Sequence, residues 1–478
     1  MSTQQQEFET VIGLEIHIQL QTRTKMFCGC ALSFGEEPNT RTCPVCLGLP
    51  GALPVTNARA VHYGLMIGLA VGSELAPRSI FHRKNYFYPD SPKGYQISQF
   101  DEPLCLGGEL GGVRIHRVHL EDDAAKLVHA GASGRLHASQ TSVVDFNRAG
   151  TPLAEIVTEP DVRSAEQAGE FLRLLRTTMR ALGVSDVNME EGSLRCDANI
   201  SIRPVGSTEL GTKTELKNMN SFRFIERGIR AEVARQEALV RAGESVVQET
   251  LHFDPRTEAI TSLRSKEEAH DYRYFPEPDL IPVAITEEML EAARADMPEL
   301  PAAREERFLA LGLVDELARQ LAWRTELADF FEAALAAAAG DAAPPAVAHW
   351  VSDLVARIEQ EDPADSNVTP AALARVVALV DAKAITTGAG RQVLEKLVAG
   401  GGDPDAIVEA EGLGAVGGED TLGPIVAAAL EANPDVAEKL RGGDMKPVGV
   451  IVGFVMKETK GRADGKEVTR LVREQLGL

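Results

Sequence analysis

Two residues near the start of the chain, Glu15 and His17, have the types and the spacing of a metal or phosphate site. They lie in residues 11–20, where apolar and polar residues alternate, and this pattern predicts a half-buried β-strand. Residues i and i+2 of a strand point to the same face, so Glu15, His17 and Gln19 share one face. A solvent-facing strand edge is the alternative, and the acidic stretches further along the chain argue against it.

Four cysteines form two closely spaced pairs, Cys28 with Cys30 and Cys43 with Cys46. Tetrahedral Zn²⁺ takes four soft ligands, and Cys-Pro-Val-Cys is typical of a zinc knuckle. Because a closed four-cysteine site leaves no position for a substrate, we predict a structural zinc site near residues 28–46. Four buried free thiols are the alternative.

Acidic residues recur in three further stretches. Residues 119–123 read His-Leu-Glu-Asp-Asp, Glu155 lies in an apolar frame, and Asp197 and Asn199 stand two apart on a predicted strand. Carboxylates gathered at one place repel each other unless a cation neutralises them, and Mg²⁺ prefers oxygen ligands and accompanies phosphates. Each acid alone is typical of a solvated surface, so the prediction of Mg²⁺ rests on their number and framing.

A further stretch combines positive charge with aromatic rings. We predict that Arg83, Lys84 and Lys93 hold phosphates, and that Tyr86 or Tyr88 stacks on a base. A loop with core aromatic residues is the alternative.

Lys213, Glu215 and Lys217 form another alternating polar set. The chain has no G-x-x-x-x-G-K-[ST] sequence, so the use of ATP requires a site other than a P-loop. It also has no Gly-x-Ser-x-Gly sequence. The sequence therefore indicates metal, phosphate and acid chemistry without an evident acyl-transfer nucleophile.

Charge and hydropathy bear on whether the protein binds nucleic acid or a membrane. The chain of 478 residues has a formal net charge of −22, which argues against a large nucleic-acid footprint because Lys and Arg supply affinity for phosphates. The segment from Arg441 onward has eight basic and five acidic residues, a net of +3, so a nucleic-acid contact is expected there. We expect a cytoplasmic protein without membrane contact, since no apolar run is long enough to span a bilayer and no secretory signal is visible.

The predicted elements alternate irregularly between helices and strands. A helix is expected after Ser164, with Gln167 completing a capping box and Gly183 at its end, and a second from Ser221 to Gly243. Strands are expected at 143–146, 198–202 and 212–216. This order indicates an α+β fold.

A composition change near residue 298 marks a boundary, because the chain then becomes rich in Ala, Leu, Val and Glu. We predict a catalytic domain at 1–297, a helical domain at 298–405 and a small all-α tail domain at 406–478.

These stretches, in this order, resemble the B subunits of the aspartyl/glutamyl-tRNA amidotransferases. The matching runs are 11–20, 83–100, 119–126, 145–161, 186–202, 216–222 and 271–282. The resemblance covers nearly the whole chain. One departure is Asp123-Ala-Ala-Lys126, where the family usually has Asp-Ala-Gly-Lys.

The resemblance implies a heterotrimer with an amidase (glutaminase) partner, which releases ammonia from glutamine, and a small third partner. The B subunit would bind ATP, Mg²⁺ and a tRNA misacylated with Glu or Asp, and would phosphorylate the side-chain carboxylate. Ammonia would then displace phosphate to give Gln-tRNA(Gln) or Asn-tRNA(Asn), the activity of a glutamine-hydrolysing carbon–nitrogen ligase. The implied fold is an antiparallel cradle similar to glutamine synthetase and guanidino kinases, followed by helical and tail domains.

The resemblance also assigns residues. The implied Mg²⁺ ligands and catalytic groups are Glu15, His17, Glu121 or Asp122, and Glu155. Arg195, Asp197 and Asn199 would lie in the same pocket. Lys213 and Lys217, from the alternating polar set, are our further candidates for nucleotide contacts. The tail residues expected to contact tRNA are Lys457, Lys460, Arg462, Lys466 and Arg470.

Two other functions remain open from the sequence. One is a free-standing ATP-dependent ligase of the glutamine synthetase type, and the other is a zinc-stabilised tRNA-binding scaffold with structural acids.

Overall fold

The computed structural model describes residues 7–32, 35–130, 141–219, 221–254, 256–265, 272–360, 362–416, 418–459 and 461–478. The chain divides into two compact units, residues 1–300 and 301–478. The first mixes strands with helices, and the second is helical in its described residues. This confirms the prediction of an α+β chain.

One large sheet organises the first unit, with the strand order β15-β14-β13-β12-β1-β11-β8-β6-β2 and β7 paired to β8. Its strands are β1 (Phe8–Gln19), β2 (Glu74–Leu75), β6 (Cys105–Leu106), β7 (Glu109–Leu110), β8 (Val113–Asp122), β11 (Pro152–Thr158), β12 (Leu194–Pro204), β13 (Thr214–Met219), β14 (Glu249–Asp254) and β15 (Ala259–Ser265). Among the described strands of this sheet, only β13 and β14 pair in parallel.

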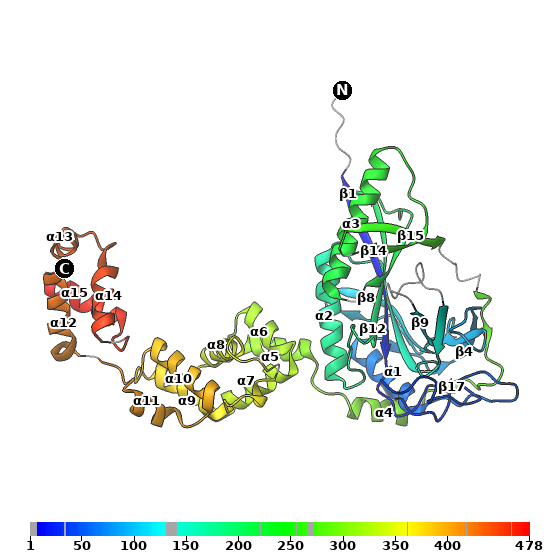
Figure 1. Ribbon diagram of the computed structural model, residues 1–478, viewed down its shortest axis with the longest axis horizontal. Coiled ribbons are helices and arrows are strands. Elements are labelled where there is room, and N and C mark those ends of the chain that lie inside the picture. The colour runs from blue at the N-terminus through cyan, green and yellow to red at the C-terminus, as the bar shows by residue number, and fades with distance from the viewer. Residues whose placement is uncertain are drawn as a thin grey trace. The chain divides into compact units, whose positions relative to one another are not determined.

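Smaller sheets and four helices complete this unit. The strands are β3 (Arg78–Ser79) with β17 (Val283–Ala284), β4 (Phe81–Asn85) with β5 (Tyr95–Gln99) and β16 (Phe275–Pro276), and β9 (Lys126–Ala130) with β10 (Thr141–Asp145). The helices are α1 (Ala58–Ala70), α2 (Ala165–Ala181), α3 (Phe222–Arg241) and α4 (Glu287–Ala295). Figure 1 shows α2 and α3 along one face of the large sheet.

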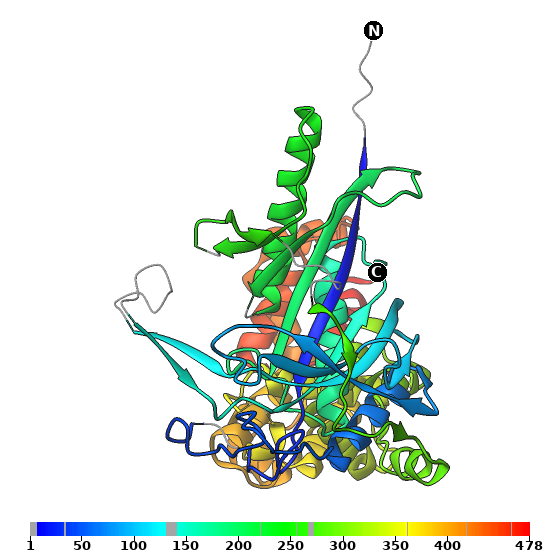
Figure 2. The same cartoon turned by 90° about the vertical axis from the view of Figure 1, so that its right-hand side faces the viewer.

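Strand β1 lies in the middle of the sheet, between β12 and β11, as the long dark-blue strand of Figure 2. Leu14, Ile16 and Ile18 are each 0% exposed, whereas the residues between them are partly exposed. The predicted alternation is therefore confirmed, and it gives this central strand one apolar and one polar face.

The two predicted helices form with the expected caps. Ser164 Oγ accepts the backbone N–H of Gln167 at 3.1 Å, and the Gln167 side chain accepts the N–H of Arg163 at 2.8 Å. The reciprocal bond thus reaches one residue further back than in a standard capping box. Ser221 caps α3 by accepting the N–H of Phe224 at 3.2 Å.

A buried polar network joins α3 to the sheet. Gln236 Nε2 lies 3.0 Å from Ile200 O and 2.9 Å from Thr214 Oγ1, and the Thr214 hydroxyl donates to Glu232 at 2.7 Å. Glu232, Gln236 and Thr214 are each 0% exposed. The network therefore holds β12 and β13 against α3.

The second unit contains helices in two hydrophobic clusters. Its helices are α5 (Pro301–Ala310), α6 (Asp315–Ala322), α7 (Thr325–Ala338), α8 (Pro344–Val355), α9 (Pro370–Asp381), α10 (Thr387–Gly400), α11 (Pro404–Glu411), α12 (Glu419–Ala432), α13 (Pro434–Arg441), α14 (Val448–Glu458) and α15 (Gly465–Leu476), with a 3₁₀ turn at Pro363–Asp365. The apolar run at 448–456 is helical. Within the described residues, no helix has the length and apolarity needed to cross a membrane.

Replacing Leu172 of α2 by Ala is expected to lower the free energy of unfolding of the first unit by about 2–5 kcal/mol, because this fully buried side chain would leave a cavity. Val247→Ala is the matched control, since Val247 is 66% exposed and such changes usually stay within about 0.5 kcal/mol. Native-state hydrogen exchange of peptides from residues 7–254 measures both. Equal effects of the two substitutions would contradict the packing described.

Candidate functional site

The polar face of β1 lies opposite polar residues on both neighbouring strands. His17 is in register with Glu155 of β11 and Arg195 of β12, and Glu15 is in register with Asp197 of β12. Because strand neighbours in register share a face, residues distant in sequence meet at the centre of the sheet.

The first cluster joins β1, β11 and β8. His17 Nε2 lies 3.5 Å from Glu155 Oε2 and 3.6 Å from Glu121 Oε1. His119 Nε2 lies 3.1 Å from Glu155 Oε2. Glu121 is 1% exposed and Glu155 is 7% exposed. His17, Glu121 and Glu155 each bring a ligand atom within 4.8 Å of the others, so they could hold a metal ion.

Opposite charges in this cluster stabilise one another. Exclusion of water opposes a positive charge on His17, but the carboxylates of Glu155 and Glu121 outweigh it and raise the pKa of His17. Burial likewise opposes a negative charge on Glu155, but His119 and His17 outweigh it and hold the pKa of Glu155 well below its usual range. Glu155 is therefore ionised and available as a metal ligand.

The second cluster lies beside the first and contains Glu15, Asp197 and Glu215, whose ligand atoms are also within 4.8 Å of one another. Lys217 forms an ion pair with Asp197 and lies 3.2 Å from Glu215. Asn199 Nδ2 donates to Glu15 Oε1 at 2.9 Å. Burial opposes the charge on Lys217, but Asp197 and Glu215 outweigh it and raise the pKa of this lysine. Lys217 thus partly balances the charge of the acids.

Both clusters face one cavity of about 590 Å³. Its acidic and histidine lining residues are Glu15, His17, His119, Glu155, Asp197 and Glu215. Its basic lining residues are Lys84, Arg117, Lys213 and Lys217, and its aromatic ones are Phe100, Tyr272 and Tyr274. The cavity therefore offers metal-ligating oxygens, cations and aromatic rings together.

Lys84 interacts electrostatically with two carboxylates of the first cluster, Glu121 and Glu155. Burial opposes its charge, but Glu121, Tyr274 and Glu155 outweigh it and raise the pKa of Lys84. Its Nζ lies 4.9 Å from the centroid of the Tyr272 ring. A cation held here suits a phosphoryl group bound at the carboxylates.

A smaller cavity of about 230 Å³ adjoins the first and shares Glu15 and Lys213 with it. Its apolar lining residues are Val11, Leu14, Val157, Pro160 and Leu210, and Gly13 and Gly211 contribute backbone. It opens where the pairing of β11 becomes irregular between Val157 and Thr158.

The structure places the neighbours Glu121 and Asp122 on opposite faces of β8. Asp122 forms an ion pair with Lys93 and accepts the N–H of Ile97 at 2.8 Å. Asp122 and Lys93 line a separate small cavity of about 80 Å³ together with Cys28. Alternation along the strand therefore brings only Glu121 into the histidine–carboxylate cluster.

Arg83, Tyr86 and Tyr88 do not line the large cavity. Arg83 donates to both oxygens of the buried Glu277, at 2.6 and 2.7 Å. The rings of Tyr86 and Tyr88 have centroids 5.8 Å apart, and Tyr88 is 42% exposed. Within residues 82–95, only Lys84 lines the large cavity.

Arg195 points to Asp123, and its Nη2 donates to Asp123 Oδ2 at 2.8 Å. Gln19 of β1 donates to the same oxygen at 3.0 Å, and Arg148 lies 3.6 Å from it. Burial opposes the charge on Asp123, but Arg195 and Arg148 outweigh it and lower its pKa. This ion-pair group adjoins the cluster without lining the large cavity.

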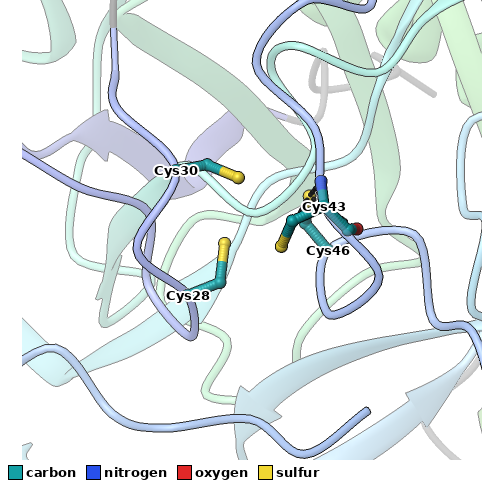
Figure 3. A group of neighbouring side chains, drawn as sticks. All are labelled: Cys28, Cys30, Cys43 and Cys46. Carbon is teal, nitrogen blue, oxygen red and sulfur yellow. Dashed lines mark hydrogen bonds between the residues drawn. The ribbon is translucent and has the colours of Figure 1, made fainter.

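The four cysteines come together in a single group (Figure 3). Their sulfur atoms all lie within 4.8 Å of one another, and the Cys43 N–H donates to Cys46 Sγ at 3.2 Å. A hydrogen bond from Cys28, the Cys43 backbone and the charge of Lys25 together lower the pKa of Cys46 to about 4. Four converging soft donors fit a tetrahedral Zn²⁺ site.

The basic residues near the C-terminus are spread over α14, α15 and the turn between them. Lys457 lies in the last turn of α14, and Lys466 and Arg470 of α15 line one groove. Arg470 is paired with Glu467 and Glu474, at 2.8 Å each. Arg462 donates to Thr459 O and Gly412 O at 3.0 and 3.2 Å. Lys460 lies outside the described residues.

Sequence reasoning missed several residues of the cavity, above all His119 and Arg117 of β8. Both precede Glu121 by even steps on one strand, so strand alternation was the signal that could have found them. Glu215 was visible as part of an alternating set but was not assigned as a ligand. Tyr272 and Tyr274 come from a distant segment, and no local pattern predicts their position.

Comparison with known proteins places the chain in a family. The model of the GatB/GatE catalytic domain matches residues 10–291, and the model of the GatB domain matches residues 329–476. Similar proteins, each named as the B subunit of an aspartyl/glutamyl-tRNA(Asn/Gln) amidotransferase, occur in Anaeromyxobacter sp. (strain K), Thermobifida fusca and Persephonella marina. They are 51%, 49% and 46% identical, over 98% of this chain and 99%, 94% and 100% of their own lengths, respectively.

Replacing Glu155 by Gln is expected to lower the pKa of His17, because the carboxylate that outweighs burial would be lost. An NMR titration of the His17 ring in metal-free protein measures this change. Glu209→Gln is the control, because Glu209 is exposed and does not line the cavity. An unchanged or higher pKa of His17 in the Glu155 variant would contradict the pairing.

Proposed function

We propose, because this chain belongs to the family of aspartyl/glutamyl-tRNA(Asn/Gln) amidotransferase B subunits, that its cavity activates the side-chain carboxylate of a misacylated tRNA for amidation. The observation that carries this proposal is the meeting of two metal-ligating clusters with four basic side chains around one cavity. A binding scaffold has no need for buried carboxylates at such short separations.

The reaction has two steps. An oxygen of the Glu or Asp side chain bonds to the γ-phosphorus of ATP, the bond from that phosphorus to the β–γ bridging oxygen breaks, and ADP leaves. The nitrogen of ammonia then bonds to the acyl carbon and loses one proton, while the bond from that carbon to the phosphate oxygen breaks. Phosphate leaves, and Gln-tRNA(Gln) or Asn-tRNA(Asn) remains.

This route needs no nucleophile from the protein, only positioning and charge stabilisation. Lys84 and Lys217 are the cations that we expect to bind the transferring phosphoryl group. Lys213 and Arg117 add positive charge to the lining of the same cavity. These four basic groups stand around the carboxylates, so they favour a dense negative charge between them.

Two cation positions fit the donor sets. His17, Glu121 and Glu155 would form one Mg²⁺ site, and Glu15, Asp197 and Glu215 would form the other. When bound, Mg²⁺ neutralises phosphate oxygens and orients them for transfer. Glu121 rather than Asp122 is the ligand in this proposal, because Asp122 is paired with Lys93 on the opposite face.

The nucleotide fits best with its phosphates across both clusters and its base in the adjoining cavity of about 230 Å³. Aliphatic side chains and two glycines line that cavity together with the polar side chains of Thr158, Asn199 and Ser201, and such a mixed lining suits a base. This arrangement replaces Tyr86 and Tyr88 as the proposed base contacts, and leaves Arg83 and Lys93 with structural ion pairs.

The remaining expectations from the family belong to the same proposal. An amidase partner would supply ammonia, a small third partner would complete a heterotrimer, and the basic tail residues would contact tRNA. The proposed domain division is 1–297, 298–405 and 406–478, with a cradle similar to glutamine synthetase. The four cysteines would hold a structural Zn²⁺.

The test is a single-turnover assay of the chain assembled with its amidase and small partners, supplied with Glu-tRNA(Gln), Mg²⁺, ammonium and γ-labelled ATP. Glu155→Ala is expected to lower the rate of amide formation about 100-fold or more, since several kcal/mol of charge stabilisation would be lost. Glu209→Ala, at an exposed position, is expected to keep the wild-type rate.

The outcomes of this assay test the metal site and separate the amidotransferase subunit from the ligase and the scaffold. Amidation that persists in Glu155→Ala would contradict the proposed metal site. No amidation of any misacylated tRNA by the wild-type assembly would contradict the proposed function and favour a ligase for a free amino acid or a scaffold. Loss of ATP hydrolysis in Glu155→Ala would separate the ligase from the scaffold.

Removing zinc is expected to destabilise residues 25–50 without directly abolishing phosphoryl transfer, because the four sulfurs do not line the cavity of about 590 Å³. The double substitution of Cys43 and Cys46 by Ser provides the zinc-free protein. Hydrogen exchange should rise first in peptides of residues 35–50. A well-folded zinc-free protein that has lost only its chemistry would contradict the structural role.

A further inference from the structure

We propose that Lys25 is the buried counterion of a metal tetrathiolate at Cys28, Cys30, Cys43 and Cys46. This inference rests on the zinc site proposed above and assigns a role to a residue outside both carboxylate clusters. Lys25 would stabilise the bound metal and join the cysteine loop to the turn that precedes β11.

The surroundings of Lys25 are unusual for a lysine. Its side chain is 0% exposed, and it is among the largest fully buried side chains of the described residues. Its Nζ lies 3.6 Å from Cys46 Sγ and 3.2 Å from Phe146 O. Among the described residues, no carboxylate oxygen comes within the 4.0 Å of an ion pair with it, in contrast to Lys93 and Lys217.

A buried ammonium group is unfavourable unless an anion faces it. Lysine has three donors and no acceptor, and a neutral carbonyl such as Phe146 O supplies no full negative charge. The sulfur of Cys46 is the partner that can supply one. The contact of the buried Lys25 with Cys46 is therefore an observation independent of the convergence of the four sulfurs.

The charge on the metal group explains what Lys25 would do. Zn²⁺ with four thiolates carries a net charge of −2, and one adjacent ammonium reduces the local sum to −1. A hydrogen bond to a ligating sulfur also makes that thiolate less prone to leave the metal, as outer-sphere partners do in other metal sites. Loss of Lys25 should therefore speed the release of zinc.

Lys25 also couples the cysteine loop to the catalytic sheet. The carbonyl that it binds belongs to Phe146, just after β10, and the next residue of the loop, Met26, donates its N–H to Gly150 O at 2.8 Å. Asn39 adds bonds to the same turn, to Asp145 Oδ1 at 3.1 Å and from the N–H of Phe146 at 2.8 Å. Lys25 is thus a positioning residue, which contacts the turn that leads into the strand of Glu155.

The experiment measures zinc directly in the full chain. Lys25→Met removes the charge at similar length, Lys25→Gln keeps a donor without the charge, and Lys25→Arg keeps the charge. Lys396→Met is the matched control, because Lys396 is an exposed lysine whose ion pair with Glu411 lies in the second unit. Zinc content is determined by atomic emission, and transfer of zinc to a chromogenic chelator gives the release rate.

Wild type, Lys25→Arg and Lys396→Met are expected to hold zinc and release it slowly. Lys25→Met is expected to release it about tenfold faster, equivalent to ~1.4 kcal/mol. In cobalt-substituted protein, the thiolate-to-cobalt charge-transfer band of Lys25→Met should move to longer wavelength, because the sulfur would lose a hydrogen bond. Neither readout depends on enzyme activity.

Three results would overturn the inference, and they differ in whether the zinc site itself also fails. If wild type holds zinc and Lys25→Met releases it at the same rate, Lys25 is not the counterion but the zinc site stands. If wild type purified with zinc present holds none, both the zinc site and the role of Lys25 fail. Should Lys25→Met not fold, equal release rates for Lys25→Gln and Lys25→Arg would overturn the inference.

Discussion

The central constraint on this structure is the alternation of side chains along β1. Its apolar residues are fully buried on one face of the sheet, and this burial fixes the direction of Glu15 and His17 on the other. A shift of pairing by one residue would exchange the two faces. The apolar core therefore sets the register on which the metal-ligating geometry depends, because β11 and β12 bring Glu155 and Asp197 opposite β1 in that register.

Charge balance is the second requirement, and it is met locally. His17 and His119 face Glu155, Lys217 faces Asp197 and Glu215, and Arg195 faces Asp123. Each of these acids has a basic side chain nearby, which offsets part of the cost of gathering carboxylates on the polar face of the sheet.

Local patterns predicted β1, the ends of α2 and α3 and the convergence of the cysteine pairs, because alternation, caps and ligand spacing act over a few residues. They could not decide between Glu121 and Asp122, since that choice depends on which face of β8 meets His17 and Glu155. Arg83 illustrates the limit of composition. Its charge suggested phosphate binding, but its partner Glu277 is 194 positions away in the sequence and was not predictable from nearby residues.

The pairing of β1 has a consequence for how the protein is made. Ile18 pairs with Leu194 and Phe8 with Pro204, so the partners are 176 to 196 positions apart. At a synthesis rate of roughly 5–20 residues per second, β1 leaves the ribosome roughly 10–40 s before β12 exists. Strand β11 is also translated well after β1, so for most of that interval the nascent chain carries an apolar strand with neither of its sheet neighbours. Strand β1 is thus translated long before the sheet can enclose it, and its apolar residues need chaperone protection during that interval.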